Sequence, residues 1–196
     1  GDGGAIATNN KLIADKLFAL RVNGMDKESW KRNTLHGSGD YAITNAGFKY
    51  HMNDLAASLG IHQIRKLEKF ILIRKKIADT YDSEFSDISE VKTPFRIPNT
   101  RHAHNLYPIL IDIDRLKVSR NDIMEMLKDF NIGTVVYYRP LHLHPYYQKT
   151  FGYRSGDFPN SEYVFNRLIC LPIYPGMRPN DAKFVTKVVK KIINDN

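Results

Sequence analysis

The sequence predicts a mixed fold, between the α/β and the α+β classes, for this chain of 196 residues. Two observations lead to this prediction. Beyond Ser83, short segments typical of strands alternate with helical segments, which indicates a small sheet covered by helices. Before them lies one much longer helical segment, and a helix of that length often joins two lobes. The chain is long enough for one sizeable domain, or for a larger and a smaller unit, with a buried core.

The composition is typical of a globular protein. Hydrophobic residues make up 42 % of the chain and charged residues 26 %, which are ordinary values for a soluble domain. No run approaches the roughly 18–20 apolar residues that a membrane-spanning helix needs, so we expect no membrane partner. Cys170 is the single cysteine. It excludes an intramolecular disulfide and fits a reducing compartment, so we expect a cytoplasmic protein.

The net charge is +8, which is compatible with an anionic partner such as a nucleic acid, a phosphorylated metabolite or a membrane surface. Many of the lysines and arginines fall in helical segments, and this favours solvated helix faces over a binding surface.

The first part of the chain is predicted to contain a short strand, a helix and a long loop. A GDGG turn precedes the strand, Ala5–Thr8, and because a natural protein rarely opens on the second half of a loop, we expect a piece of a longer chain. Asn9 or Asn10 is expected to cap a helix from about Lys11 to Arg21. The polar loop that follows, Met25–Asn45, is of a length that is usually functional or mobile.

The long helical segment is predicted to begin after Asn53, as its cap, and to continue to about Tyr81. Such a helix could reach roughly 40 Å. Residues 83–101, with two prolines, are expected to form a linker. The apolar positions of the helix repeat near the helical period of 3.6 residues: Leu55, Leu59, Ile64, Leu67, Ile71 and Ala78.

Beyond the linker, the first expected elements are a strand over Leu106–Ile113 and a helix that ends at Phe130. Ser119, with Asp122 three residues later, resembles a capping box for this helix. The remaining expected elements are a helix at about Asn160–Arg167, a strand at Leu168–Leu171, and a closing helix at Asp181–Asn194 with Phe184, Val188 and Ile192 facing inward.

The segment Ile132–Tyr147 unites two aromatic pairs, an arginine and two histidines. Its first part, Ile132–Tyr138, is predicted to be a strand that ends before Pro140, because proline cannot donate to a ladder. We expect an extended, ring-rich loop after it. A polar aromatic cluster at the end of a strand is a favourable place for a ligand.

Three other interpretations of these residues are weaker. The pairs His142/His144 and His102/His104 could ligate zinc from an extended segment, but no Cys, Asp or Glu stands at a familiar metal spacing beside them. Cys170 lies in an apolar run, which indicates an inert core thiol. The tyrosines could stack on bases, but no recognised nucleic-acid-binding signature accompanies them.

Six motifs follow one another along the chain. In order they read GDGG-AIATN, NGMD…WKR, GFKYHMNDLAASLG, NIGT…YYRPLHLHPYY, FGYRSGDFPNSE and LPIYPGM. In this order and at this spacing, essentially the whole chain resembles the C-terminal half of the DegT/DnrJ/EryC1/StrS family of sugar aminotransferases. The resemblance implies the type I fold of pyridoxal-phosphate (PLP) dependent transferases. Residues 1–54 would end the large PLP-binding domain, residues 55–82 would form a connecting helix, and residues 83–196 would form the small C-terminal α+β domain.

The resemblance also implies an activity. Such enzymes use PLP to move an amino group, usually from glutamate, onto a nucleotide-linked keto-sugar, and they supply amino sugars for surface polysaccharides or antibiotics. They work as homodimers with shared active sites, and neither a nucleic acid nor a membrane is an expected partner. The lysine that forms the Schiff base would lie about five residues before the GDGG turn, upstream of residue 1. This chain therefore has no assigned catalytic residue, and we expect it to be inactive alone.

The resemblance suggests five binding residues. Lys49 stands where the family has an asparagine that reaches the PLP phosphate across the dimer, and a lysine suits a phosphate well. His51 stands where an arginine meets the sugar nucleotide. Tyr137 and Tyr138 replace the pair that contacts the diphosphate or the base, and Tyr137 stands where the family more often has histidine. His142 matches the histidine of the family's P-L-H sequence.

Two alternatives remain open at the level of the sequence. One is a PLP- or PMP-dependent sugar dehydratase of the same family, in which a histidine replaces the Schiff-base lysine. The other is a non-enzymatic basic module that binds an anionic polymer through the positive charge and the tyrosines.

Overall fold

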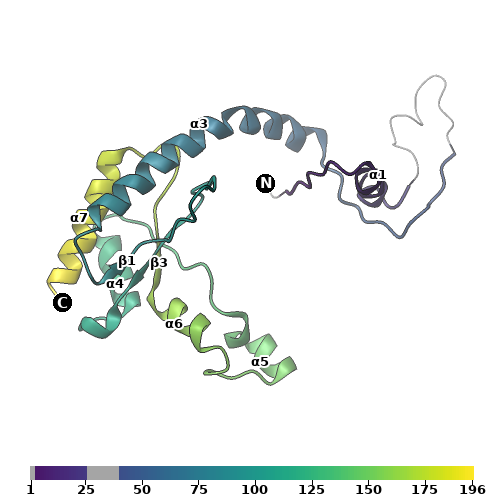
Figure 1. The fold of residues 1–196 in the computed structure, drawn as a ribbon. Helices are drawn as coiled ribbons and strands as arrows, with labels where there is room; N and C mark the ends of the chain where they lie inside the picture. The colour runs from purple at the N-terminus through teal and green to yellow at the C-terminus, as the bar shows by residue number, and fades with distance from the viewer. Residues whose placement is uncertain (1–2, 26–39) are drawn as a thin grey trace. The chain divides into compact units, whose positions relative to one another are not determined.

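The structure is a computed structural model that describes residues 3–25 and 40–196 (Figure 1). Two predicted segments lie partly outside the described residues. They are the GDGG turn, at its first two residues, and the loop predicted at 25–45, at most of its length including Trp30. The chain divides into two compact units, Gly1–Arg65 and Lys66–Asn196, and each is described here by itself. The division falls inside the longest helix, and the three-part domain assignment made from the sequence stays a prediction.

In the first unit, helix α1 (Lys11–Leu20) begins where its cap predicts. The Asn10 side chain accepts hydrogen bonds from the backbone N–H groups of Leu12 and Ile13, at 3.0 and 3.3 Å, so asparagine capping is confirmed. The predicted strand at Ala5–Thr8 is wrong. These residues are exposed and pair with no other strand within the described part of the chain. Their β-propensity alone does not produce a strand, because a strand also needs a partner with which to form backbone hydrogen bonds.

Two glycines allow the chain after α1 to approach the segment that carries Lys49. Gly24 has a φ of +75°, and a Cβ atom there would lie 1.8 Å from the carbonyl oxygen of Asn45. A Cβ atom on Gly47 would lie 2.0 Å from the backbone nitrogen of Gly24. Only glycine, which has no Cβ atom, allows the two backbones to come this close, so both positions require glycine.

Helix α3 (Asp54–Glu84) is longer than predicted but begins as predicted. The Asn53 side chain accepts a hydrogen bond of 2.9 Å from the N–H of Ala56. The predicted apolar face is buried only toward the C-terminal end of the helix. Ala78 is fully buried, whereas Leu55 is 82 % exposed within the described chain.

The second unit contains a three-stranded antiparallel sheet in the order β1-β2-β3. Strand β2 (Tyr107–Ile111) lies in the centre, with β1 (Val91–Lys92) on one side and β3 (Leu168–Leu171) on the other. The predictions for β2 and β3 are confirmed, with β2 slightly shorter. The predicted linker over residues 83–101 is corrected because it contains β1, which is too short for periodicity to reveal.

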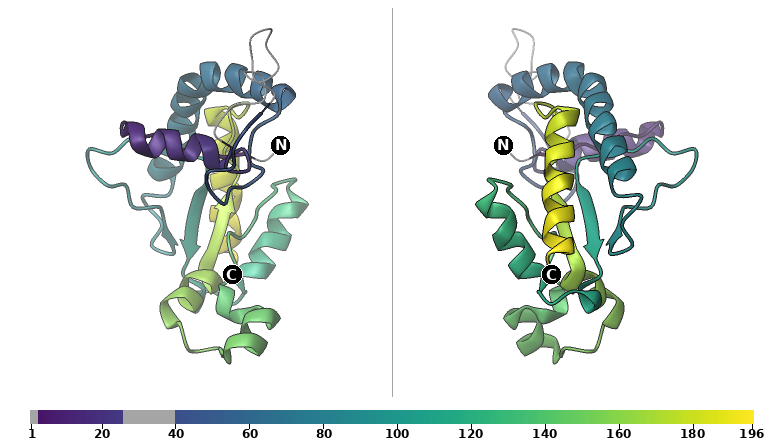
Figure 2. Two further views of the ribbon diagram at one scale, coloured as in Figure 1. Left: turned by 90° about the vertical axis from the view of Figure 1, so that its right-hand side faces the viewer. Right: turned by 90° about the vertical axis from the view of Figure 1, so that its left-hand side faces the viewer.

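Helices α4 (Arg120–Asp129) and α7 (Pro179–Asn194) lie side by side along the sheet (Figure 2). Both helices were predicted, and α4 begins with the predicted capping box. Val188 and Ile192 of α7 are buried as expected. Phe184 is 50 % exposed, so the prediction that it faces inward is wrong; the buried stripe of the helix runs through Ala182, Val185 and Val189 beside it.

The core of this unit joins the end of α3 to the sheet. Tyr81 of α3 is fully buried, and its ring centroid lies 4.7 Å from that of Tyr107 in β2. The Tyr81 hydroxyl donates a hydrogen bond of 2.8 Å to the carbonyl oxygen of Pro172, and the Tyr107 hydroxyl donates one to the Asp82 carboxylate. Both buried hydroxyls of this ring pair therefore have a hydrogen-bond partner.

Cys170 is 3 % exposed, and burial raises the pKa of its thiol. The prediction that Cys170 lies in the core is confirmed.

Removing the cap of α4 by Ser119→Ala is expected to lower the free energy of unfolding by about 1 kcal/mol. The Ser119 hydroxyl accepts a hydrogen bond from the N–H of Asp122, and the Asp122 carboxylate accepts one of 2.8 Å from the N–H of Ser119. Urea unfolding of the intact protein measures the change. Ser119→Thr retains a capping hydroxyl and should cost less, and equal losses for both variants would contradict this role.

Candidate functional site

The predicted strand at Ile132–Tyr138 is wrong. Only Val135 pairs with the sheet: its N–H donates to the carbonyl oxygen of Cys170 at 3.4 Å, and the Cys170 N–H donates back at 2.9 Å. Because β3 is already paired with β2, the segment follows the free edge of β3 for a single bridge and then leaves it. Its β-branched and aromatic residues favour strands, but a strand also needs a partner along its length.

The segment after Pro140 is helical rather than an extended loop, which corrects the second part of that prediction. It forms a short 3₁₀ turn, η2 (Leu141–Leu143), and then helix α5 (Pro145–Phe151). Pro145 is the first residue of α5, where proline suits a helix. Gly152 ends the helix at a φ of 74°. Helices α5 and α6 (Pro159–Arg167) lie together beyond one end of the sheet (Figure 1).

Tyr137 and Tyr138 lie at the surface, with exposed fractions of 40 % and 75 %, and their ring centroids are 4.7 Å apart. The peptide bond between them is cis. Together with residues of α6 they line a hollow of about 700 Å³, which we call the tyrosine hollow. Its lining residues are Tyr137, Tyr138, Arg139, Pro140, Leu141, Asn160, Ser161, Val164, Phe165 and Leu168.

His142, the third predicted substrate residue of this segment, is only 5 % exposed. Its Nε2 atom lies 2.9 Å from a carboxylate oxygen of Glu162, and its ring centroid lies 4.7 Å from that of Phe158. An ionised carboxylate only accepts hydrogen bonds, so Nε2 is the donor. The observed contacts of His142 therefore hold η2 against α6, and a contact with substrate stays a prediction.

The Glu162 carboxylate accepts three hydrogen bonds from two segments of the chain, η2 and the loop between α5 and α6. It accepts them from the Ser155 hydroxyl at 2.7 Å, from His142 at 2.9 Å and from the Gly156 N–H at 2.7 Å. These bonds, with that of Ser155 the strongest, lower the pKa of Glu162 to about 2. Sequence reasoning missed Glu162, because a glutamate in a helix gives no sign of partners outside that helix.

A second hollow, of about 510 Å³, adjoins the tyrosine hollow, and we call it the ring pocket. Five of its eight lining residues carry aromatic or imidazole rings. The lining residues are Pro140, Leu141, His142, Tyr147, Phe151, Tyr153, Phe158 and Ser161. Of these, the sequence motifs singled out His142 and placed the tyrosine at 147 in the segment Ile132–Tyr147, whereas the rings between 151 and 158 stood only within the motif FGYRSGDFPNSE.

Lys49 and His51 lie in the first unit. Lys49 forms a β-bridge with Val22, and its neighbours Phe48 and Tyr50 donate backbone hydrogen bonds to residues at the end of α1. Both side chains are exposed, and neither forms an ion pair within the described residues. The predicted tyrosines, Tyr137 and Tyr138, belong to the second unit.

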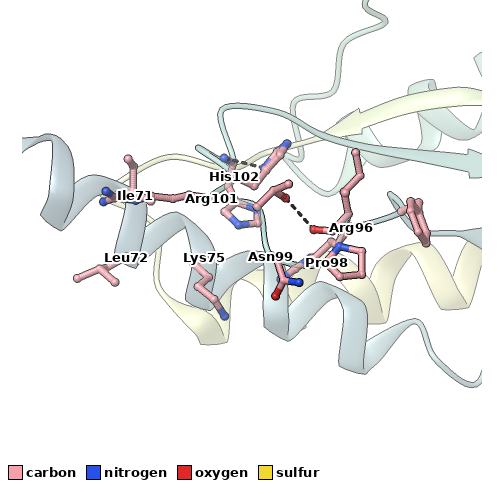
Figure 3. Close-up of a pocket in the computed structure, with 12 residues that line it drawn as sticks. Ile71, Leu72, Lys75, Arg96, Pro98, Asn99, Arg101 and His102 are labelled. Carbon is pink, nitrogen blue, oxygen red and sulfur yellow. Dashed lines mark hydrogen bonds between the residues drawn. The ribbon is translucent and has the colours of Figure 1, made fainter.

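A larger hollow of about 790 Å³ lies between α3 and the segment 95–104 (Figure 3). Both His102 and His104 line it, and the backbone N–H of His104 donates a hydrogen bond of 3.0 Å to the His102 ring. Its cations are already paired: Lys75 with Asp79, Arg96 with Asp79 and Asp82, and Arg101 with Glu68. The paired charges do not favour an anion there, and no group of three potential metal-ligating side chains occurs among the described residues.

Comparison with known families decides what this chain is. The model of the DegT/DnrJ/EryC1/StrS aminotransferase family matches residues 1–191. The chain belongs to this family. The DegT/DnrJ/EryC1/StrS resemblance seen in the order of the motifs is thereby confirmed.

Two curated relatives match the chain over almost its whole length. An uncharacterised protein of Methanocaldococcus jannaschii is 48 % identical over 196 residues, which are 100 % of this chain and 51 % of that protein. The spore coat polysaccharide biosynthesis protein SpsC of Bacillus subtilis is 40 % identical over 194 residues, 98 % of this chain and 50 % of SpsC. The chain thus spans about half the length of the curated relatives it matches.

A solved structure supports the fold. The chain resembles Helicobacter pylori PseC, an aminotransferase involved in the biosynthesis of pseudoaminic acid, with a TM-score of 0.79 and 22 % identity over 96 % of this chain and 48 % of PseC. The fold predicted from the DegT/DnrJ/EryC1/StrS motifs, a mixed fold of the type I PLP-dependent transferases, is confirmed. Within the described residues, no helix is both long and apolar enough to cross a membrane.

Acid should weaken the hydrogen bonds of Glu162. Its pKa in the folded chain is about 2, below the ordinary 4.5, so its contribution to stability is present above pH 4.5 and is lost as the pH falls toward 2. Thermal unfolding of the intact protein and of Glu162→Gln, measured across this range, should show their stability difference shrinking with acid. Glu84→Gln is the control, and an equal pH dependence for it would contradict the prediction.

Proposed function

We propose that the intact protein is a PLP-dependent aminotransferase that transfers an amino group, with glutamate as donor, to a nucleotide-linked keto-sugar. The observation that carries this proposal is the family match over residues 1–191. The similarity to SpsC, whose name places it in spore coat polysaccharide biosynthesis, favours a role in making amino sugars for a polysaccharide. The chain described here would supply binding residues, and the Schiff-base lysine would come from upstream of residue 1.

The residues of the first unit suit the phosphate of PLP. Lys49 offers an exposed ammonium group on a backbone that is fixed by hydrogen bonds on both sides. A cation held in this way meets a phosphate without losing an internal ion pair. Bound PLP would supply the electron sink for the carbon that gains or loses the amino group. We propose that Lys49 holds the phosphate within a homodimer whose active sites are shared, and that His51 approaches the sugar nucleotide.

The second unit suits a nucleotide-linked sugar. The exposed rings of Tyr137 and Tyr138 and the guanidinium of Arg139 border one hollow. A ring and a cation side by side match a base or sugar attached to a phosphate. We propose that these residues contact the nucleotide portion of the substrate, and that His142 supports them from its buried position beside Glu162.

A transamination assay of the intact protein tests this function. The protein, supplied with PLP and glutamate, is incubated with UDP- or dTDP-linked keto-sugars, and the amino sugar and 2-oxoglutarate are quantified. We expect glutamate-dependent amination together with the visible absorbance of bound PLP. Loss of water from the sugar without amination would instead support a dehydratase of the same family.

The absence of both PLP absorbance and amination in the intact protein would overturn the proposal. In that case, a gel shift with single-stranded nucleic acid at low salt tests the remaining alternative, a basic binding module. Such binding should weaken as salt rises, because it depends on release of counterions. The aminotransferase proposal expects no shift.

A further inference from the structure

We propose that residues 95–104, which we call the strap, form an acid-sensitive closure of the larger hollow. The strap lies against α3 at neutral pH and detaches when His102 and His104 take up protons. It belongs to the connection between β1 and β2 and contains neither a helix nor a strand. The hollow of about 790 Å³ lies between the strap and α3 (Figure 3). This device is independent of the proposed reaction.

The strap is attached through polar side chains rather than through a hydrophobic interface. Among the described residues, no backbone–backbone hydrogen bond reaches residues 95–104. Its two large apolar side chains, Phe95 and Ile97, are 85 % and 64 % exposed. Surface that stays in water gains no transfer free energy, so burial of these side chains contributes little to the attachment.

The contacts between the strap and α3 all involve arginines. They are the ion pairs of Arg96 with Asp79 and Asp82, the ion pair of Arg101 with Glu68, and a hydrogen bond of 3.0 Å from Arg74 to the carbonyl oxygen of Ala103. Burial alone would raise the pKa of Asp79, but the bonds from Lys75 and Arg96 outweigh it and lower that pKa. This carboxylate therefore stays ionised in mildly acidic solution.

The end of the strap is held by an unprotonated imidazole nitrogen. The backbone N–H of His104 donates a hydrogen bond of 3.0 Å to Nδ1 of His102, so this nitrogen carries no proton. The two ring centroids lie 4.6 Å apart. His104 is 6 % exposed and has a φ of 47°, which few residues other than glycine adopt readily. A proton on Nδ1 of His102 would replace the acceptor by a donor and break the bond that supports this turn.

The surroundings of His104 also oppose a second positive charge. Burial, followed by His102 and Arg96, lowers the pKa of His104 below its ordinary value, and the attraction of Asp79 does not reverse this. The carboxylates that α3 presents to the strap are already in ion pairs: Glu68, Asp79 and Asp82. The cations around the hollow are Arg74, Lys75, Arg96 and Arg101. An imidazolium therefore gains no carboxylate of its own here.

Acid therefore favours the detached strap. Because the pKa of His104 is lower in the closed strap than its ordinary value of 6.5, the closed form binds fewer protons than the detached form. The contribution of neutral His104 to closure is present above pH 6.5 and is lost as the pH falls below it. Detachment would uncover the side of α3 that lines the hollow, at Ile71, Leu72 and Lys75.

Limited proteolysis of the intact protein measures detachment. Trypsin cuts after Arg96 and Arg101, and both guanidinium groups are engaged in ion pairs while the strap is closed. The initial cleavage rate at these bonds is divided by that of a synthetic peptide of residues 93–106 at the same pH, which removes the pH dependence of trypsin itself. Between about pH 7.5 and about pH 5.5 we expect this ratio to rise severalfold, by at most about 10-fold for each histidine that regains an ordinary pKa.

Variants of the histidines identify the titrating groups. In the double variant, His102→Asn retains an acceptor near the position of Nδ1, and His104→Gln is polar but takes up no proton. The double variant should lose the pH dependence. His102→Asn alone keeps the packing of His104, so it should be as resistant as the unmodified protein near pH 7.5 and respond less to acid. His62→Gln removes an exposed histidine of α3 outside the strap and should keep the full response.

Three results would overturn the proposal. One is a ratio in the unmodified protein that does not change over this pH range. Another is a ratio near one at about pH 7.5, because the strap would then already be free. The third is an equal rise in the double variant, which would assign the titration to other groups. Thermal unfolding at both pH values separates local detachment from global unfolding, and none of these results depends on PLP or on amination.

Discussion

Replacing Ile169 by alanine is expected to lower the free energy of unfolding by about 2–5 kcal/mol. Ile169 is fully buried in β3, directly opposite Ile109 of β2, which is also fully buried. All four residues of β3 are buried, so the neighbours cannot move into a cavity there without disturbing packing elsewhere. The loss should therefore include both the transfer free energy of the missing methyl groups and the cost of the cavity.

Urea unfolding of the intact protein, followed by circular dichroism, measures this change. The matched control is Leu141→Ala, because Leu141 is 63 % exposed and its truncation should change stability by less than about 0.5 kcal/mol. Similar losses at the two positions would show that the sheet does not form the core of this unit.

Replacing Lys49 by alanine is expected to weaken PLP binding about 10- to 150-fold, since a hydrogen bond to a charged group contributes about 1.5–3 kcal/mol. The exposed Lys49 side chain has no ion pair within the described residues, so its removal leaves no carboxylate unpaired. The fixed backbone at the Val22 bridge should be unaffected. The expected result is a protein of normal stability that loses its cofactor on dialysis.

Titration of the cofactor-free intact protein with PLP, followed by absorbance, gives the affinity without requiring turnover. Lys49→Arg should retain most of the affinity, because arginine also carries a positive charge and donates to phosphates. Lys16→Ala removes an exposed lysine of α1 and should have no effect. Unchanged PLP affinity in Lys49→Ala would rule out the assigned contact with the phosphate.

Local signals in the sequence predict the helices well. Asn10, Asn53 and Ser119 each accept the hydrogen bond expected of a cap, because a cap depends only on the next few residues. The same kind of signal was present for α5, where Pro145 opens the helix and Gly152 ends it. It was overlooked because the rings of this segment suggested a loop.

The errors in strands come from pairing. Residues 132–138 have the composition of a strand but pair with the sheet at Val135 alone, whereas Val91 and Lys92 form a strand within a predicted linker. The partner of a strand lies far away in sequence, so composition does not determine whether a segment joins a sheet.

The candidate site shows the same limit. The motifs pointed to Tyr137 and Tyr138, which border a hollow. They did not indicate that His142 is buried against Glu162, because these residues are far apart in sequence and meet only through the packing of η2 on α6. The rings between 151 and 158 stand in the motif FGYRSGDFPNSE but show no helical or strand periodicity, and their common pocket becomes visible only in the structure.

Two of the three hydrogen bonds of Glu162 hold residues outside the lining of the ring pocket. They fix the loop through the Ser155 hydroxyl and the Gly156 backbone, and neither of these residues lines the pocket. Side chains at positions 151 and 153 can therefore be exchanged while the loop keeps its attachment. Exchanges at these two positions should therefore alter the lining of the pocket alone, whereas loss of the Glu162 carboxylate would release the loop and His142 together.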